Sequence, residues 1–148
     1  MTGTRGRRRP PRRWGSFPTT ADVGVWATGP GSDALLEALG LGLFSVITDL
    51  RTVRAREERD VRASAEDAPS LVVAFLGELL LLQQTEGFLV RALRVHAVGD
   101  PPTSVVARAA GEPFDAARHL ARTEVKAVTF HGLVFDPVRG RARVILDI

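Results

Sequence analysis

The order of apolar patterns along the chain restricts its fold more than any other feature. Two segments in the first half carry apolar side chains at helical spacing. The first begins near Ser32 or Asp33, either of which can cap it, and runs to Asp49. The second opens at Asp67, has a proline in its first turn and runs to about Gln84. Because it is apolar almost all round, we expect it to be largely buried.

The other patterned segments alternate between apolar and polar residues, as half-buried strands do. In the second half of the chain they follow one another without a helix between them. This order predicts a single α+β domain, with two helices packed on a mainly antiparallel β-sheet, and it disfavours a doubly wound fold. The expected strands span residues 23–27, 61–65, 88–98, 104–110, 125–135 and 142–148.

The connections between these strands are also indicated. Arg91 and Arg94 are three residues apart in one expected strand, so in a regular strand they would point to opposite faces. This predicts a bulge or twist between them. Residues 99–102 are rich in Gly, Asp and Pro and predict a turn, and residues 136–140 predict a hairpin connection into the last strand. Residues 112–121 are expected to form a loop with one helical turn.

Composition limits the class of protein. The chain has 148 residues, 45% of them hydrophobic, which suffices for one core. Cysteine is absent, so disulfides and thiolate metal sites are excluded and a reducing compartment is allowed. The apolar run at Leu79–Leu82 is interrupted by Glu78 and Gln83 and is too short to span a bilayer, and no secretory signal follows the basic start. We expect a cytoplasmic protein without a membrane partner.

The charge is divided unevenly. Six arginines stand in the first thirteen residues, whereas all 17 Asp and Glu residues follow them. We expect residues 1–13 to be a disordered Arg-rich tail and residues 14–148 to be the folded domain. The tail could bind RNA or another polyanion by neutralising phosphates. A solvated extension, or a start codon assigned upstream of the true one, is the alternative.

Catalytic motifs are not recognisable. The sequence has no Walker-type phosphate loop, no dinucleotide fingerprint after a strand, and no Ser-His-Asp order that spacing identifies. His96, His119 and His131 are dispersed, and we expect His96 to be a hydrogen-bonded structural residue.

Lys126 is the only lysine among 20 basic residues that are otherwise all arginine. Lysine is a compact point charge, whereas arginine is a rigid planar fork, so the exception suggests a position that requires an ammonium. Glu124 and Lys126 are two apart around the start of an expected strand and should point to the same face. Chance placement, or a surface ion pair of little energetic value, is the alternative.

Carboxylates offer a second lead. Asp22 opens one expected strand, and Asp147 stands beside the terminal carboxylate of Ile148 at the end of another. Oxygen ligands of this kind suit a hard divalent cation, Ca²⁺ or Mg²⁺. From the residues alone, aspartates at strand ends are also common turn formers.

Several motifs together resemble the archease family. The strongest are Gly111-Glu112-Pro113-Phe114-Asp115 and the run from Thr123 to His131 that contains Glu124-Val125-Lys126-Ala127-Val128-Thr129. Further matches, in family order, are Thr20-Ala21-Asp22-Val23-Gly24, Leu76-Gly77-Glu78-Leu79-Leu80 with Thr85-Glu86-Gly87-Phe88, and the terminal strand Ala142–Ile148. The resemblance extends from about Phe17 to the last residue.

The resemblance implies a function. Archeases activate the RtcB-type RNA ligase in tRNA splicing and RNA repair by promoting guanylylation of the ligase's active-site histidine and multiple turnover. It therefore implies a protein cofactor with no substrate of its own. It also implies that Asp22, Asp147 and the C-terminal residue Ile148 bind a divalent ion, and it makes Lys126 and Glu124 candidates for activation. The family usually has histidine where this chain has Thr19, so a role of that histidine is in doubt here.

Two other functions remain open at this stage. One is a metal-dependent phosphohydrolase that uses Asp22 and Asp147, although no clear general base accompanies them. The other is an RNA-binding chaperone that acts through the basic N-terminal tail, whose binding would fall steeply with salt.

Overall fold

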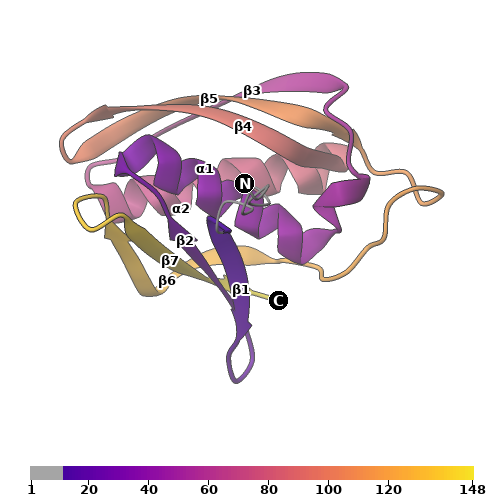
Figure 1. The fold of residues 1–148 in the computed structure, drawn as a ribbon, viewed down its shortest axis with the longest axis horizontal. Coiled ribbons are helices and arrows are strands. Elements are labelled where there is room, and N and C mark those ends of the chain that lie inside the picture. The colour runs from indigo at the N-terminus through magenta and orange to yellow at the C-terminus, as the bar shows by residue number, and fades with distance from the viewer. Residues whose placement is uncertain (1–11) are drawn as a thin grey trace, which may run out of the picture.

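Two antiparallel sheets enclose two helices in the computed structural model, which describes residues 12–148 (Figure 1). One sheet has the strand order β1-β2-β7-β6 and the other the order β3-β5-β4. The helices are α1 (Gly31–Ile47) and α2 (Ala68–Glu86), and a 3₁₀ turn, η1 (Leu50–Thr52), follows α1. The strands are β1 (Trp14–Pro18), β2 (Val23–Thr28), β3 (Glu57–Ser64), β4 (Phe88–Gly99), β5 (Pro102–Pro113), β6 (Ala127–Asp136) and β7 (Arg141–Asp147).

The α+β class with two helices is confirmed, and the strands form two sheets where one was expected. The expected strands are all present, with shifted ends, and β1 is an additional strand that pairs with β2. The sheets divide because pairing joins segments that lie far apart in the chain, such as β2 with β7 and β3 with β5. Alternation within a segment carries no information about these partners.

The two helices begin differently. The second helix begins where it was predicted, after Asp67. The Asp67 carboxylate caps α2 by accepting the N–H of Ser70 at 2.8 Å, and Gly87 ends the helix in the left-handed conformation, with φ 67°. The prediction that Ser32 or Asp33 caps α1 was wrong. Pro30 precedes that helix without a side-chain cap, and the Asp33 carboxylate instead accepts the N–H of Ala97 on β4 at 2.8 Å.

The core lies between the sheets and is filled by both helices. Phe44 of α1, Phe75 of α2 and Phe88 of β4 are completely buried, together with many leucines. Within the part of the chain that the structure describes, α2 is the one helix whose length and composition would suffice to cross a membrane. Here it packs against strands of both sheets (Figure 1). One side of α2, which carries the buried residues between Leu71 and Leu80, fills the core, whereas Leu81 is 49% exposed. The prediction that the second helix is largely buried was therefore wrong, because its other side faces solvent.

The predicted turns and bulge are present. The pairing of β4 with β5 shifts between Val90 and Ala92, which places Arg91 in a bulge. The connection between β6 and β7 is a tight hairpin in which the Asp136 carboxylate accepts the N–H of Arg139 at 3.0 Å. The prediction that a strand includes residues 125–126 was wrong, because β6 begins only at Ala127.

The tail expected at residues 1–13 falls mostly on residues 1–11, outside the part of the chain that the structure describes. Arg13 precedes β1 but is already attached to the sheet, since its carbonyl accepts the N–H of Thr28 at 2.8 Å.

Candidate functional site at the carboxylate edge of the four-stranded sheet

Strand register brings the predicted site residues to one end of the four-stranded sheet. Val23 of β2 pairs with Leu146 of β7, so the next position along each strand sets Asp22 opposite Asp147. On the other side of β7, Asp147 pairs with Ala127, and the N–H of Lys126 donates to the Asp147 carbonyl at 2.7 Å. We call the end formed by Asp22, Lys126, Asp147 and Ile148 the carboxylate edge.

A tight turn holds Asp22. The N–H of Thr19 donates to the Asp22 carbonyl at 3.2 Å, and the Thr19 hydroxyl accepts the N–H of Asp22 at 3.2 Å. Thr19, the position at which the chain departs from the family pattern, thus closes the β1–β2 hairpin. The Thr19 hydroxyl fixes the backbone of Asp22, so the Asp22 carboxylate is not needed to hold the turn.

The segment that carries Glu124 and Lys126 is extended and tied down. The N–H of Arg122 donates to the Ile47 carbonyl at 2.9 Å, and the buried side chain of Val125 anchors the middle. Glu124 and Lys126 flank Val125 and are both exposed. They therefore project from the same side of this segment, as the two-residue spacing predicted, although the segment precedes β6.

The carboxylate edge offers oxygen ligands and a free cation. Among residues 12–148, neither Asp22, Asp147 nor Lys126 takes part in an ion pair. No group of three or more His, Cys, Asp and Glu side chains in the described residues could hold a metal by itself. Two aspartates and the Ile148 carboxylate fit Ca²⁺ or Mg²⁺ in donor type, with the remaining coordination positions left to water or a partner.

Two hollows flank these residues. One, of about 300 Å³, lies between the ends of α1 and α2, and Glu124 stands on its rim together with Arg122 and Phe114. The other, of about 370 Å³, lies beside the Thr19–Asp22 turn, and His131 and Arg143 also line it. His131 thus lies near Asp22. His96 is exposed on β4 and pairs with Val106 through its backbone, but its imidazole has no hydrogen-bond partner among the described residues, so the expected role as a hydrogen-bonded structural residue was wrong.

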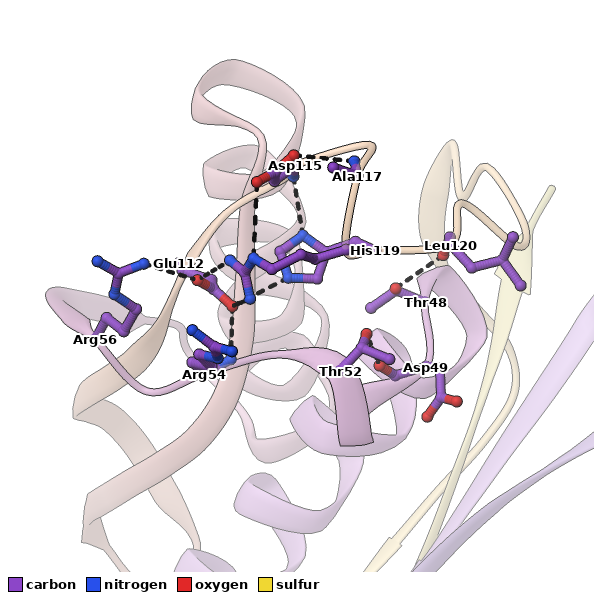
Figure 2. A network of polar contacts seen from close by, with 11 residues as sticks. Thr48, Asp49, Thr52, Arg54, Arg56, Glu112, Asp115, Ala117, His119 and Leu120 are labelled. Carbon is purple, nitrogen blue, oxygen red and sulfur yellow. Dashed lines mark hydrogen bonds and ion pairs between the residues drawn. The ribbon is translucent and has the colours of Figure 1, made fainter.

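A buried carboxylate, which the sequence did not reveal, organises the loop that leads to Glu124. Glu112, 3% exposed, accepts the N–H of Arg54 at 2.7 Å, and its other oxygen accepts the Arg118 guanidinium (Figure 2). The ring of His119 lies against the same carboxylate, with Nε2 at 3.0 Å from Oε2. These contacts hold the 115–119 turn onto the strand end of β5.

The hydrogen bonds define the state of His119. Its Nδ1 accepts the N–H of Asp115 at 2.9 Å, so Nε2 must carry the proton and donate to Glu112 (Figure 2). Hydrogen bonds from Arg118 are the main reason that the pKa of Glu112 falls from 4.5 to about 2, and those from Arg54 and His119 lower the pKa further. The network therefore contains a carboxylate that stays ionised through neutral pH.

The alternation of buried and exposed residues along β5 does not predict that Glu112 is buried. Val105, Ala107 and Ala109 are buried and point to the core, so the parity of β5 would place Glu112 toward solvent. It is buried because the following turn folds back over it. The sequence feature that could have indicated this burial is the pair Arg118 and His119, six and seven residues after Glu112. Across one turn, their side chains can reach back to the carboxylate.

Known proteins resemble this chain over almost its full length. The protein archease of Thermococcus gammatolerans is 39% identical over 141 residues, which cover 93% of this chain and 99% of the relative. The protein archease of Methanothermobacter thermautotrophicus is 39% identical over 135 residues, which cover 89% and 96%.

Structure and sequence agree on the relationship. The solution structure of Methanobacterium thermoautotrophicum protein 1598 superposes with a TM-score of 0.74 at 35% identity, covering 93% of this chain and 99% of that chain. The pattern of the Archease protein family matches residues 14–148. The chain therefore belongs to the archease family.

Proposed function

We propose that this protein activates an RtcB-type RNA ligase, by promoting guanylylation of the ligase and its multiple turnover in tRNA splicing and RNA repair. In this proposal it is a cytoplasmic protein cofactor without a substrate of its own. The observation that carries the proposal is the register of β2, β7 and β6, which sets Asp22, Asp147 and Lys126 at one edge. Membership of the archease family supports the choice of partner.

A divalent cation, Ca²⁺ or Mg²⁺, belongs to the proposal. Asp22, Asp147 and the carboxylate of Ile148 would hold it, and when bound it would supply a positive charge able to meet a phosphate. The residues of the chain do the rest: the Thr19 hydroxyl orients the Asp22 backbone, and the Lys126 N–H fixes the end of β7. The exposed position of Asp147 allows a partner to reach this edge.

Lys126 and Glu124 would contact the ligase. The Lys126 ammonium offsets the repulsion between neighbouring carboxylates and can meet a phosphate from any direction. Glu124, exposed beside the hollow of about 300 Å³, can accept a basic group of the partner. The side chain of Val125 and the two backbone anchors at Arg122 and Lys126 keep this pair in place, which lowers the entropy lost on binding.

The test is guanylylation of the cognate ligase, followed with labelled GTP under multiple-turnover conditions, with and without this protein. We expect turnover beyond one cycle only when the protein is present. A ligase that turns over equally well alone would refute activation. The protein alone, incubated with phosphoester substrates, separates activation from hydrolysis, since release of phosphate would support the phosphohydrolase.

A further inference from the structure

We propose that the outer face of the four-stranded sheet binds single-stranded RNA, with bases stacked on Trp26 and Phe17 and phosphates held by Arg141 and Arg143. We call these four residues the stacking face. It is distinct from the N-terminal arginines and from the carboxylate edge. The choice of RNA over other polyanions rests on the proposed function, whereas the site itself rests on the geometry that follows.

The two faces of this sheet differ in character. Val25, Ala27 and Val144 point inward to the helices and are at most 1% exposed. The alternate residues of the same strands point the other way, where neither helix covers them (Figure 1). Trp26 and Phe17 are half-buried on that outer side, and Arg141 and Arg143 are exposed. The open face of this sheet thus carries aromatic as well as basic residues, and a face that only contacts water does not require the aromatic ones.

Both aromatic rings lie flat on glycines. A Cβ at Gly15 would approach the Trp26 ring to within 2.5 Å, and one at Gly24 would stand 2.0 Å from the Phe17 ring. Gly15 and Trp26 are paired residues of β1 and β2, as are Phe17 and Gly24. Each ring therefore covers the backbone of the neighbouring strand and turns its other side outward, the geometry that base stacking requires.

Arginines stand beside the rings in register. Arg143 of β7 pairs with Trp26, and Arg141 pairs with Thr28. Neither guanidinium has an ion-pair partner among the residues that the structure describes, and Arg143 donates only to the Gly132 carbonyl, at 3.2 Å. Asp136, across from Arg141, already binds Arg139. Two guanidinium groups are thus available to phosphates next to two half-buried rings.

A hollow of about 370 Å³ adjoins the Phe17 ring and has room for a nucleobase. Arg143, Ile145 and His131 also line it, together with Asp22 of the carboxylate edge. A base placed there would stack against apolar surface and keep its polar edge near the Arg143 guanidinium and the imidazole. The hollow thus extends the stacking face toward the carboxylate edge.

The place where the basic segment joins the sheet favours a polyanion. β1 is the edge strand next to Trp26, and Arg12 and Arg13 immediately precede it. Four more arginines stand before them in the sequence. A protein partner with an apolar patch would have to bury Arg141 and Arg143 without compensation, which is costly. Single-stranded RNA satisfies both the rings and the arginines.

Fluorescence anisotropy of a labelled, uridine-rich RNA of about twelve nucleotides, titrated with the full chain, tests the proposal. We expect Trp26→Leu and Phe17→Ala each to weaken binding about five- to one-hundred-fold, the usual contribution of one stacked base. Trp26→Leu keeps apolar cover over Gly15, so the fold is preserved. Arg143→Gln should reduce the slope of log affinity against log salt by about one.

Matched variants control for nonspecific effects. Phe114→Ala removes an exposed ring from another loop, and Arg62→Gln removes an exposed arginine from the other sheet, so both should bind like wild type. In Trp14→Phe, Trp26 is the only tryptophan left, and its fluorescence should be quenched by the RNA. A duplex of the same length hides its base faces and should bind more weakly.

Each of several results would overturn the inference. They are unchanged affinity in Trp26→Leu and Phe17→Ala, equal affinity for duplex and single strand, or binding that disappears only when residues 2–11 are removed. If the ring variants lost affinity for the ligase but not for RNA, the face would be a protein interface and the inference would also fail. Because the RNA assay contains no ligase, its failure leaves activation of the ligase untouched.

Discussion

At the scale of single residues, Glu112 and Lys126 show two ways in which a charge is used. Glu112 is buried and fully hydrogen-bonded, and it shapes the loop before the site. Lys126 is exposed and has no ion-pair partner in the described part of the chain, so its charge remains available to a partner. Glu112 therefore contributes to packing, whereas Lys126 has its role only in the proposed contact with the ligase.

Glu112→Gln should lower the free energy of unfolding by about 2–3 kcal/mol, because it leaves Arg118 and the Arg54 N–H with weaker acceptors in a buried place. The pKa of Glu112 is depressed, so the stabilisation is complete above pH 4.5 and is lost as pH falls toward about 2. Urea unfolding at several pH values measures both effects.

The exposed Glu66→Gln is the matched control and should change stability by less than about 0.5 kcal/mol. If wild type and Glu112→Gln lost stability in parallel between pH 4.5 and about 2, the carboxylate would not be the group that the network stabilises.

Lys126→Arg keeps the charge but replaces a point charge by a planar fork, so it should impair ligase guanylylation by about tenfold or more, as should Lys126→Ala. The melting temperature should stay the same, because an exposed lysine contributes little to folding. The rate of ligase guanylylation and the melting temperature are both measured on the same preparation of each variant. Full activity in both variants would make the sole lysine an accident of composition.

At the scale of elements, the features that could be predicted depended on residues that lie close together in the chain. The start of α2 was predicted at Asp67, whose hydrogen-bond partner Ser70 is only three residues away. The cap of α1 was missed because Asp33 is recruited by Ala97 on a distant strand. Alternation found most strands, but it could not tell that β2 and β7 are neighbours. From the residues it followed only that strand ends could bring Asp22 and Asp147 together; the resemblance implied that they share a site, and the register gives the physical reason for their proximity.

The carboxylate edge leads to a prediction about metal. With Ca²⁺ or Mg²⁺ at about 100 times its Kd, wild type should gain about 2.7 kcal/mol in the free energy of unfolding. Asp147→Ala should abolish this gain and leave the fold intact, since Asp147 is exposed. Asp60→Ala removes an exposed carboxylate from β3 and should keep the gain. Equal ion-dependent shifts in wild type and Asp147→Ala would exclude this site.

At the scale of the whole molecule, two sheets around two helices leave the outer face of each sheet open, and the carboxylate edge lies at one end of the four-stranded sheet. The class of fold was predictable because the helical segments are strongly apolar and precede most of the strands. The division into two sheets and the burial of Glu112 were not, because both depend on contacts between segments that are far apart in sequence.

Removal of residues 2–11 should leave the free energy of unfolding unchanged within about 0.5 kcal/mol, because this arginine-rich segment has no apolar pattern. Ligase activation at saturating concentration should persist, and only association that is sensitive to salt should weaken. Chemical unfolding and activation assays of the shortened chain measure this. A shortened chain that is unfolded, or inactive at every concentration, would place the domain boundary before Arg12.

The most direct test of the central claim is multiple-turnover guanylylation of the cognate ligase with wild type, Asp22→Ala, Asp147→Ala and the control Asp60→Ala. The account predicts that wild type and Asp60→Ala sustain many cycles, while each variant of the carboxylate edge slows turnover by about a hundredfold or more with an unchanged melting temperature. Turnover at the wild-type rate with folded Asp22→Ala and Asp147→Ala would contradict it.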